Sequence, residues 1–184
     1  MGVPKALLTI GEKTFLQHIV AKADSAGISR TVIVLGSDAS KIKEKMLWYH
    51  GTMTVNECWQ EGQLSSILAG LNAVREFDPE GVLIWPVDRP LVAASTIAGL
   101  MANFPPAHDK IVVPRYKGMR GHPVLVGRPF FSALERAPAD VGARFILWNN
   151  QGNVVEYETD DQGVTLNIDT PGLYKSILSK GEER

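Results

Sequence analysis

The 184-residue sequence predicts a single α/β domain, spanning residues 1–184, with a largely parallel β-sheet. Three observations support this prediction. Apolar, β-branched runs of strand length alternate with amphipathic segments of helix length, as in parallel strands joined by crossover helices. The length falls within the roughly 100–200 residues of one domain. Hydrophobic residues make up 45% and charged residues 21%, which is typical of globular chains and argues against disorder.

The first half of the chain alternates helix and strand. Thr14 and Gln17 have the spacing of a capping box, and Gly27 is a suitable helix stop. The expected elements are a helix over about 15–26, a strand over 31–35, a helix from 38 to about 47, a strand over 53–56 and a helix over 64–77. The uninterrupted apolar run 31–35 is typical of a strand that is buried on both faces.

The second half continues the alternation. The expected elements are a strand over 81–87, a helix around 97–104, strands over 111–114 and 123–126, helices over about 129–135 and 143–148, a strand over 153–157 and a helix over 171–178. Thr170 and Pro171 form a cap followed by proline at the first helical position, which marks the start of the last helix. Ligands of such sheets bind beyond the carboxyl ends of the strands, so the residues that follow each strand are the candidates for chemistry.

Charge and cysteine content exclude several classes of partner. Lys and Arg number 19 and Asp and Glu 20, so a net charge of −1 offers no basic field for nucleic acid or an anionic membrane. The longest uncharged stretch, 90–108, is interrupted by prolines and does not have the pattern of a membrane span. The single cysteine, Cys58, favours a reducing, cytoplasmic location. No Lys, Arg or His flanks it, which predicts a buried small hydrophobe.

Asp88 is the first candidate for chemistry. It directly follows the apolar strand predicted over 81–87, in the turn Pro86-Val87-Asp88-Arg89-Pro90, where its carboxylate would project into the crevice. Carboxylate oxygens there suit Mg²⁺, which is a hard cation. The alternative is a turn aspartate that bonds its own backbone.

Asp169 is the second carboxylate, in Ile168-Asp169-Thr170-Pro171. Taken alone, it is better explained as a negative charge at a helix start, where it favours the helix dipole. Together with Asp88 it could complete a site that holds Mg²⁺ through one or two carboxylates and the phosphates of a substrate.

Two further segments are candidates for binding phosphate. Lys5 could hold a phosphate as a point charge, although an exposed surface lysine is the more common case. Gly62-Gln63-Leu64-Ser65-Ser66 opens the most amphipathic helix in the sequence. Its free backbone N–H groups and hydroxyls would form a cradle for an anion or a base. The alternative is that the serines only cap the helix.

The loop between the strands at 111–114 and 123–126 carries Arg120, Gly121 and His122. The guanidinium fork of Arg120 suits phosphate, and Gly121 allows a backbone to approach closely. The alternative is a polar hairpin loop without a ligand, although loops carry function more often than cores do.

Taken in order, these segments resemble the molybdenum-cofactor nucleotidyltransferase family of MobA-like NTP transferases, and within it the cytidylyltransferase branch. The matching segments are Met1–Lys5 with the end of the family signature (M-G-x-P-K), Asn56–Ile67 with N-x-x-W-x-x-G-x-x-x-S, Val87–Val92 with D-x-P-L-V, Arg120–Leu125 with R-G-H-P, and Ile168–Pro171 with I-D-T-P. Each match is weak alone, but five in the same order over nearly the whole chain are specific.

The resemblance implies a Rossmann-like, nucleotide-diphospho-sugar transferase fold and transfer of a nucleotidyl group from a nucleoside triphosphate to molybdopterin, with release of pyrophosphate. It implies that Asp88 and Asp169 hold Mg²⁺ and that Lys5 meets the triphosphate. The segment 62–66 would seat the nucleotide, and 120–122 would face the second substrate or the nucleotide. Gln63-Leu64-Ser65-Ser66 resembles the cytidylyl branch, which favours CTP.

The sequence also departs from the family pattern. The family's first strand, which lies in the middle of the sheet, and its glycine-rich loop are missing before Met1. Their absence predicts a groove in the core and the loss of an anion site. Either Met1 is internal to a longer protein, or the chain lacks both parts. The alternatives to catalysis on molybdopterin are a non-catalytic cofactor-binding or chaperone-like module for a molybdoenzyme, and a sugar-phosphate nucleotidylyltransferase.

Overall fold

The predicted capping box starts the first long helix. In the computed structural model, which describes residues 2–182, the Thr14 hydroxyl accepts a hydrogen bond from the Gln17 backbone, and the Thr14 backbone donates to the Gln17 side chain. The helices are α1 (Phe15–Ser25), α2 (Ala39–Glu44), α3 (Gln63–Val74), α4 (Ala94–Ala102), α5 (Phe131–Glu135), α6 (Phe145–Asn149) and α7 (Pro171–Glu182). Short 3-10 turns lie between several of these elements.

Six strands lie close to their predicted positions, whereas the two-residue strands β1, β2 and β7 were not predicted. They are β1 (Thr9–Ile10), β2 (Lys13–Thr14), β3 (Val32–Leu35), β4 (Thr52–Val55), β5 (Gly81–Ile84), β6 (Ile111–Tyr116), β7 (Met119–Arg120), β8 (Val124–Gly127) and β9 (Val154–Glu158). β5 ends earlier than the predicted 81–87, because Pro86 cannot donate a ladder hydrogen bond.

The main sheet is mixed, and the prediction of a largely parallel sheet was wrong. β3 pairs with β4, and β6 with β9, in parallel. β8 runs antiparallel between β5 and β6. The reason is a hairpin: β6 and β7 are joined at Lys117 and Gly118, whose positive φ values of 47° and 81° suit a two-residue turn. A connection this short cannot make a parallel crossover.

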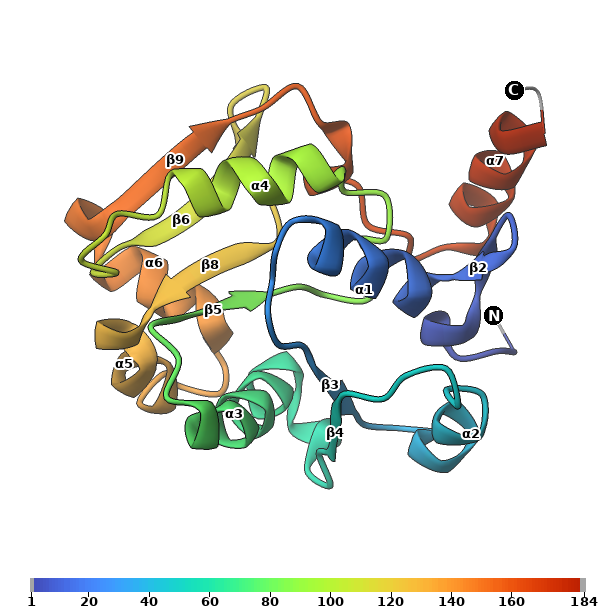
Figure 1. Cartoon of the computed structure of the whole chain (residues 1–184), viewed down its shortest axis with the longest axis horizontal. Helices are drawn as coiled ribbons and strands as arrows, with labels where there is room; N and C mark the ends of the chain where they lie inside the picture. The colour runs from blue at the N-terminus through green and yellow to red at the C-terminus, as the bar shows by residue number, and fades with distance from the viewer. Residues whose placement is uncertain (1, 183–184) are drawn as a thin grey trace.

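Helices cover both faces of the strands (Figure 1). Ile111 and Val113 of β6 face the core shared by α3, α5 and α6, whereas Val112 between them faces α4. These three side chains are fully buried. α1 packs beside α4, so it lies on the same side of the sheet. The chain therefore has the predicted α/β class, and its helices and sheet form three layers with the core on both sides of β6 and β8.

A gap divides the sheet into two parts. Within the described residues, β3 pairs only with β4, and β5 pairs only with β8, so the facing edges of β3 and β5 have no strand neighbour. Between them lies a cavity of about 710 Å³, which we call the slot. It is lined by 31–34 and 81–88 and by residues of α1 and α3. A groove in the core was expected from the family resemblance, and this expectation is confirmed.

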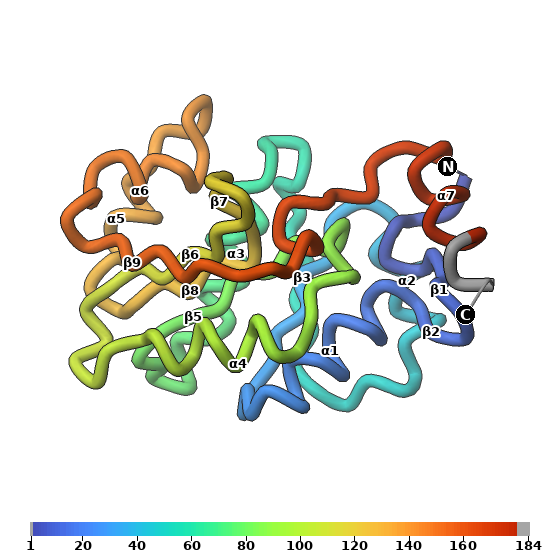
Figure 2. The backbone as a smooth tube through the Cα atoms, turned by 90° about the horizontal axis from the view of Figure 1, so that it is seen from above, coloured from blue at the N-terminus to red at the C-terminus, as the bar shows by residue number. Residues whose placement is uncertain are grey.

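The two ends of the described chain pack against each other. Tyr174 of α7 donates its hydroxyl hydrogen to the Thr9 carbonyl at 2.7 Å and packs edge-on against Phe15. Both views place α7 beside β1 and β2, and Figure 2 shows the segment after β9 crossing the molecule toward α7. This return brings the residues before α7 next to the start of the chain. No helix in 2–182 has the length and apolar character to cross a membrane.

Candidate functional site

Asp88 lies in the turn that follows β5, as predicted. The turn is closed by hydrogen bonds from the Arg89 backbone to the Pro86 carbonyl at 3.2 Å and from the Trp85 indole to the Arg89 carbonyl at 3.0 Å. One carboxylate oxygen of Asp88, Oδ1, is buried and has no hydrogen-bond partner within the described residues. Burial raises the pKa of this carboxyl group; the charge of Arg89 opposes the rise. A buried acceptor without a partner indicates a site for a ligand.

Lys5 and Asp169 come from opposite ends of the chain and form an ion pair beside Asp88. The backbone N–H of Ile168 donates to the Asp88 carbonyl at 2.8 Å, which places the next residue, Asp169, alongside the Asp88 turn. The hydrogen bond from Lys5 lowers the pKa of Asp169, and the negative charge of Asp169 contributes to the raised pKa of Asp88. Three candidates from distant segments therefore meet at one place.

The donor set at this place fits a hard cation. No cluster of three or more His, Cys, Asp and Glu side chains in residues 2–182 could hold a metal ion by itself. Asp88 and Asp169 offer carboxylate oxygens, and the buried Oδ1 of Asp88 has no hydrogen-bond partner in the part of the chain that the structure describes. Mg²⁺ is commonly bound through one or two carboxylates with water and substrate phosphates, and such a set suits it.

The segment at the start of α3 is organised by Asn56, a residue that sequence reasoning did not single out. The Asn56 side chain is buried and donates to the hydroxyls of Ser65 at 2.8 Å and Ser66 at 3.0 Å. Ser65 in turn donates to the carbonyls of Cys58 and Gly62. Ser65 thus has a structural role in the loop. The signal was present in the sequence, because asparagine begins the motif that these serines close.

Gln63 and Ser66 line the slot together with Lys5 and Asp88. Asp88 follows β5, Gln63 and Ser66 belong to the first turn of α3, and Lys5 lies in the short 3-10 turn before β1, so three separate segments supply these residues. Among the described residues no side chain caps the N-terminus of α3 at Gly62, and the first N–H groups of such a helix can bind an anion. The structure therefore gathers most of the predicted nucleotide-binding residues around one opening.

His122 is half-buried close to Arg89. Its ring nitrogen Nδ1 has no hydrogen-bond partner among the described residues, and its backbone N–H donates to the Val164 carbonyl at 2.9 Å. Arg89 donates to the same carbonyl at 2.7 Å. Burial lowers the pKa of His122 to about 4, and the positive charge of Arg89 adds to this effect. His122 is therefore neutral at neutral pH. Gly121 is required beside it, since a Cβ there would lie 2.3 Å from the Val164 carbonyl oxygen.

Residues 161–169, which we call the strap, are connected to this region by hydrogen bonds. The Asp161 carboxylate accepts hydrogen bonds from the backbone of Ala93 and the hydroxyl of Thr96, both at 2.7 Å. Val164 receives the bonds from His122 and Arg89, and Ile168 donates to Asp88. The strap thus positions Asp169 and supports the walls of the site.

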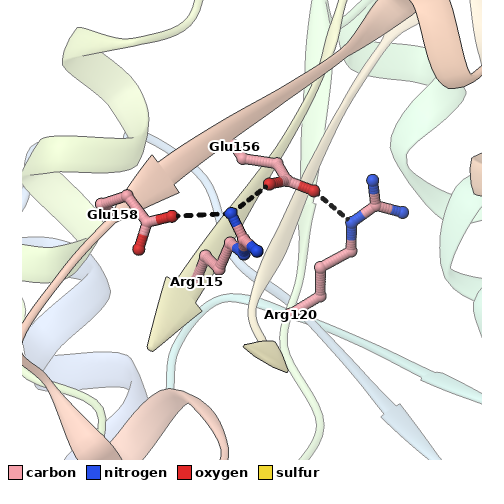
Figure 3. Close-up of polar contacts among 4 residues, drawn as sticks. All are labelled: Arg115, Arg120, Glu156 and Glu158. Carbon is pink, nitrogen blue, oxygen red and sulfur yellow. Dashed lines mark hydrogen bonds and ion pairs between the residues drawn. The ribbon is translucent and has the colours of Figure 1, made fainter. Parts of the chain in front are cut away.

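Arg120 has a different environment from the one expected of it. It donates to Glu156 of β9 at 2.7 Å, and Glu156 also pairs with Arg115, which reaches Glu158 (Figure 3). This network is partly exposed and joins β6, β7 and β9. Arg120 is thus engaged by a carboxylate, and the structure records no contact between it and Asp88 or Lys5.

Cys58, near the start of α3, differs from its predicted environment. Cys58 is exposed, so the prediction of a buried small hydrophobe was wrong. The turn that Asn56 organises holds residues 57–63 at the surface.

Arg89 is a residue that sequence reasoning overlooked. It contacts the strap, and its charge lowers the pKa values of both Asp88 and His122. Its sequence context, a charged residue between turn residues, gave no separate signal.

Comparison with solved structures confirms the Rossmann-like fold of the nucleotide-sugar transferases that the resemblance implied. The crystal structure of Rv0371c from Mycobacterium tuberculosis H37Rv is similar with a TM-score of 0.82 and 26% identity, covering 97% of this chain and 91% of that chain. A complex of Rv0371c with manganese is also similar, with a TM-score of 0.76.

Relatives in sequence point to the same family. Nicotine blue oxidoreductase of Paenarthrobacter nicotinovorans is 27% identical over 174 residues, covering 91% of this chain and 84% of that protein. A probable molybdenum cofactor guanylyltransferase of Bacillus mycoides (strain KBAB4) is 29% identical over 124 residues, covering 67% of this chain and 59% of that protein. The model of the MobA-like NTP transferase domain matches residues 1–154, and the chain therefore belongs to this family of nucleotidyltransferases.

Proposed function

We propose that residues 1–184 act as one Mg²⁺-dependent nucleotidyltransferase domain in the cytoplasm, which transfers CMP from CTP to the terminal phosphate of molybdopterin and releases pyrophosphate. Family membership supports nucleotidyl transfer. The observation that carries the proposal is the meeting of Lys5, Asp88 and Asp169 at the end of β5, where a buried carboxylate oxygen of Asp88 finds no hydrogen-bond partner in residues 2–182.

The chemistry requires alignment and charge neutralisation more than activation of a nucleophile. The second pKa of a phosphate monoester is about 6, so the acceptor is largely ionised at neutral pH. Asp88 and Asp169 would hold Mg²⁺, which supplies positive charge to the triphosphate oxygens. Lys5 adds a second cation on the same side, because its ammonium group already reaches Asp169.

The start of α3 would seat the nucleotide. Gln63 and Ser66 lie at the slot opening with Lys5 and Asp88, and Asn56 fixes the serine hydroxyls. The preference for CTP rests on the resemblance of Gln63-Leu64-Ser65-Ser66 to the cytidylyl branch. The guanylyltransferase among the relatives makes GTP the competing donor to test.

The second substrate would approach Gly121 and His122. Because its pKa is lowered to about 4, His122 offers a neutral imidazole at neutral pH. Its Nδ1, which no described residue engages, would form a hydrogen bond to a pterin or phosphate. Arg120 would reach a phosphate only by sharing or leaving Glu156.

The proposal is tested by incubating the purified chain with molybdopterin, Mg²⁺ and each of CTP, GTP and ATP, and measuring pyrophosphate release. Release with CTP that stops on chelation of the metal is the expected result. Faster release with GTP would reassign the donor, and release only with sugar 1-phosphates as acceptors would reassign the acceptor. No release with any triphosphate would reject catalysis by this chain.

A non-catalytic cofactor-binding or chaperone-like module for a molybdoenzyme is the second candidate. The observation that favours it is the slot, which leaves the core open directly beside Lys5. Titration calorimetry separates the two functions: binding of molybdopterin without Mg²⁺-dependent binding of any triphosphate supports the module, whereas Mg²⁺-dependent binding of CTP supports the transferase.

A further inference from the structure

Arg89 directly follows Asp88 and carries a half-buried positive charge that the proposed reaction does not use. Its guanidinium donates one recorded hydrogen bond, from Nη1 to the Val164 carbonyl at 2.7 Å. Within residues 2–182, no carboxylate forms an ion pair with Arg89. A guanidinium carries five N–H donors in a planar fork, and burying such a charge without a counter-ion is costly. Arg89 is therefore a candidate for binding an anionic ligand.

Arg89 is held in place at its backbone and at the tip of its side chain. Its backbone N–H donates to the Pro86 carbonyl at 3.2 Å, and its own carbonyl accepts a hydrogen bond from the Trp85 indole at 3.0 Å. The guanidinium is bonded to the carbonyl of Val164, which is a fully buried residue. A side chain that is already fixed loses little conformational entropy when a ligand binds, so this cation is preorganised.

His122 and Gly121 meet Arg89 at the same carbonyl oxygen. The His122 backbone N–H donates to the Val164 carbonyl at 2.9 Å, and the absence of a side chain at Gly121 lets this oxygen approach. Burial lowers the pKa of His122 and raises that of Asp88; the charge of Arg89 adds to the first shift and opposes the second. Arg89 is thus close to both side chains, and in each of them a buried polar atom has no hydrogen-bond partner in the described chain.

Arg120, which the family resemblance placed near the second substrate, has a different environment. Glu156 binds it at 2.7 Å and also pairs with Arg115 (Figure 3). A phosphate at Arg120 would have to compete with this carboxylate, whereas no carboxylate within residues 2–182 competes for Arg89. The family pattern D-x-P-L-V leaves the position of Arg89 unspecified, so its positive charge is a feature of this chain's own sequence.

A phosphate monoester fits the groups around Arg89. The guanidinium fork matches two phosphate oxygens, and a phosphate monoester carries about 1.5–2 negative charges at neutral pH. In one of its two neutral tautomers, His122 carries a hydrogen on Nδ1 and can donate a hydrogen bond to a third oxygen. Because Arg89 is the next residue after Asp88, a phosphate held there lies beside the proposed metal ligand, where nucleotidyl transfer requires the acceptor.

We propose that Arg89 binds the terminal phosphate of the acceptor through its guanidinium fork, with His122 as a second hydrogen-bond donor, and so selects acceptors that carry a phosphate monoester. In the reaction, an oxygen of this phosphate forms the new bond to the α-phosphorus of the triphosphate, and the bond to pyrophosphate breaks. Arg89 exchanges no proton; it orients the acceptor and offsets its charge. The role in transfer rests on the proposed function, whereas phosphate binding at Arg89 can be measured without turnover.

Titration calorimetry in the absence of divalent metal tests the binding step, with phenyl phosphate as the probe. The unchanged chain is compared with Arg89→Gln and with Arg136→Gln, a matched control at an exposed arginine. Arg89→Gln should bind the probe at least about 10-fold more weakly, because charge-assisted hydrogen bonds are lost. Arg136→Gln should bind it as the unchanged chain does. Arg89→Lys keeps the charge but lacks the fork, so its affinity should be intermediate.

Molybdopterin and its dephosphorylated form test the selection of the acceptor. Arg89→Gln should weaken the binding of molybdopterin by about 10-fold or more and leave the binding of the dephosphorylated form unchanged, because the lost contact is to the phosphate. In the pyrophosphate-release assay, the KM for molybdopterin should rise by a similar factor, while the KM for CTP at saturating Mg²⁺ stays within about twofold. If Arg89 only supported the strap, the variant would bind both forms more weakly by the same factor.

Phosphate binding and transfer can fail separately. If the unchanged chain releases no pyrophosphate with any acceptor, yet Arg89→Gln loses phenyl phosphate binding, the phosphate site is supported and the proposed function is rejected. If the chain is active and Arg89→Gln keeps the original KM for molybdopterin, the inference is wrong and the proposed function stands. Equal losses in Arg89→Gln and Arg136→Gln, or an unchanged chain that binds neither phenyl phosphate nor molybdopterin, would also overturn the inference.

Circular dichroism establishes whether the variants are folded. If Arg89→Gln does not fold, NMR spectra of the unchanged chain test the same proposal. The Nε–H resonance of Arg89, identified by its absence from the spectrum of Arg89→Lys, should shift saturably as phenyl phosphate is added. A resonance that does not move while the probe binds would place the phosphate elsewhere and overturn the inference.

Discussion

The charged groups around Asp88 and those between β6, β7 and β9 are arranged in opposite ways. Arg115, Arg120, Glu156 and Glu158 are partly exposed, and each is paired with an opposite charge (Figure 3). Around Asp88, by contrast, a buried oxygen of Asp88 and a buried nitrogen of His122 have no hydrogen-bond partner among residues 2–182.

The difference indicates where the fold tolerates a free-energy cost. An unpaired buried polar atom costs about 1–3 kcal/mol, whereas an exposed ion pair contributes about 0–1 kcal/mol. The ion pairs between β6, β7 and β9 are thus of the kind that hold neighbouring strands together without a large effect on stability. The groups near Asp88 are of the kind for which a bound ligand would supply the missing hydrogen-bond partners. Four variants can test this distinction.

Asp88→Asn should have the largest effect. It removes a charge from the proposed metal site without changing the side-chain shape, so we expect nucleotidyl transfer to fall by about 100-fold or more. The unfolding midpoint should be unchanged or higher, because a buried charge is lost. Asp109→Asn, at an exposed aspartate, is the matched control. An unchanged rate in Asp88→Asn would remove Asp88 from the metal site.

His122→Gln should have the next largest effect, on the dependence of stability on pH. The pKa of His122 in the folded chain, about 4, lies below the ordinary 6.5, so the unfolded chain binds the additional proton between these values. Its contribution to stability is complete above pH 6.5 and is lost as the pH falls toward 4, by up to about 3 kcal/mol.

Urea titrations of both chains at several pH values measure this effect. Because carboxylates also titrate in this range, the relevant quantity is the difference between the two chains. The variant should lose less stability than the unchanged chain between pH 6.5 and 4. Parallel pH profiles would show that His122 is not buried in the neutral form.

Lys5→Ala should have a smaller effect, on activity and on Asp169 together. We expect a loss of about 10-fold in kcat/KM, since one cation near the triphosphate is removed. The pKa of Asp169 should also rise, because the hydrogen bond from Lys5 keeps it low. Carboxyl NMR titration measures the pKa. Lys43→Ala, at an exposed lysine of α2, should change neither quantity.

Glu156→Gln should have the smallest effect. It weakens two partly exposed ion pairs, so we expect a loss of at most about 1 kcal/mol in the free energy of unfolding. The transfer rate should stay within about twofold of the original. A large fall in rate would assign the network to the reaction and erase the contrast between the two regions.

Local features of this fold could be predicted from the sequence. The capping box of Thr14 and Gln17 involves residues three apart, and the position of Asp88 after an apolar strand depends only on its neighbours. These signals are short-range, so tertiary structure does not override them. The motif order also indicated that Lys5, Asp88 and Asp169 belong together, although spacing alone could not place residues 164 positions apart.

Other features depend on pairings that no local pattern specifies. The position of β8 between β5 and β6 requires knowledge of strand order. The partner of Arg120, Glu156, lies 36 residues away on a strand whose register is set by β6. The buried role of Asn56 depends on the return of α3 across the end of β4. Such contacts are fixed by tertiary packing.

The strap over 161–169 couples the site to a segment outside the residues that the family model matches. Since Val164 and Ile168 are fully buried and hold His122, Arg89 and the Asp88 turn, they cannot detach one at a time without exposing apolar surface. Detachment of the strap from the rest of the chain is thus expected to be cooperative. A single proteolytic cut within the strap is therefore expected to release the Asp88 turn, Asp169 and His122 together, while leaving the strands of the main sheet paired.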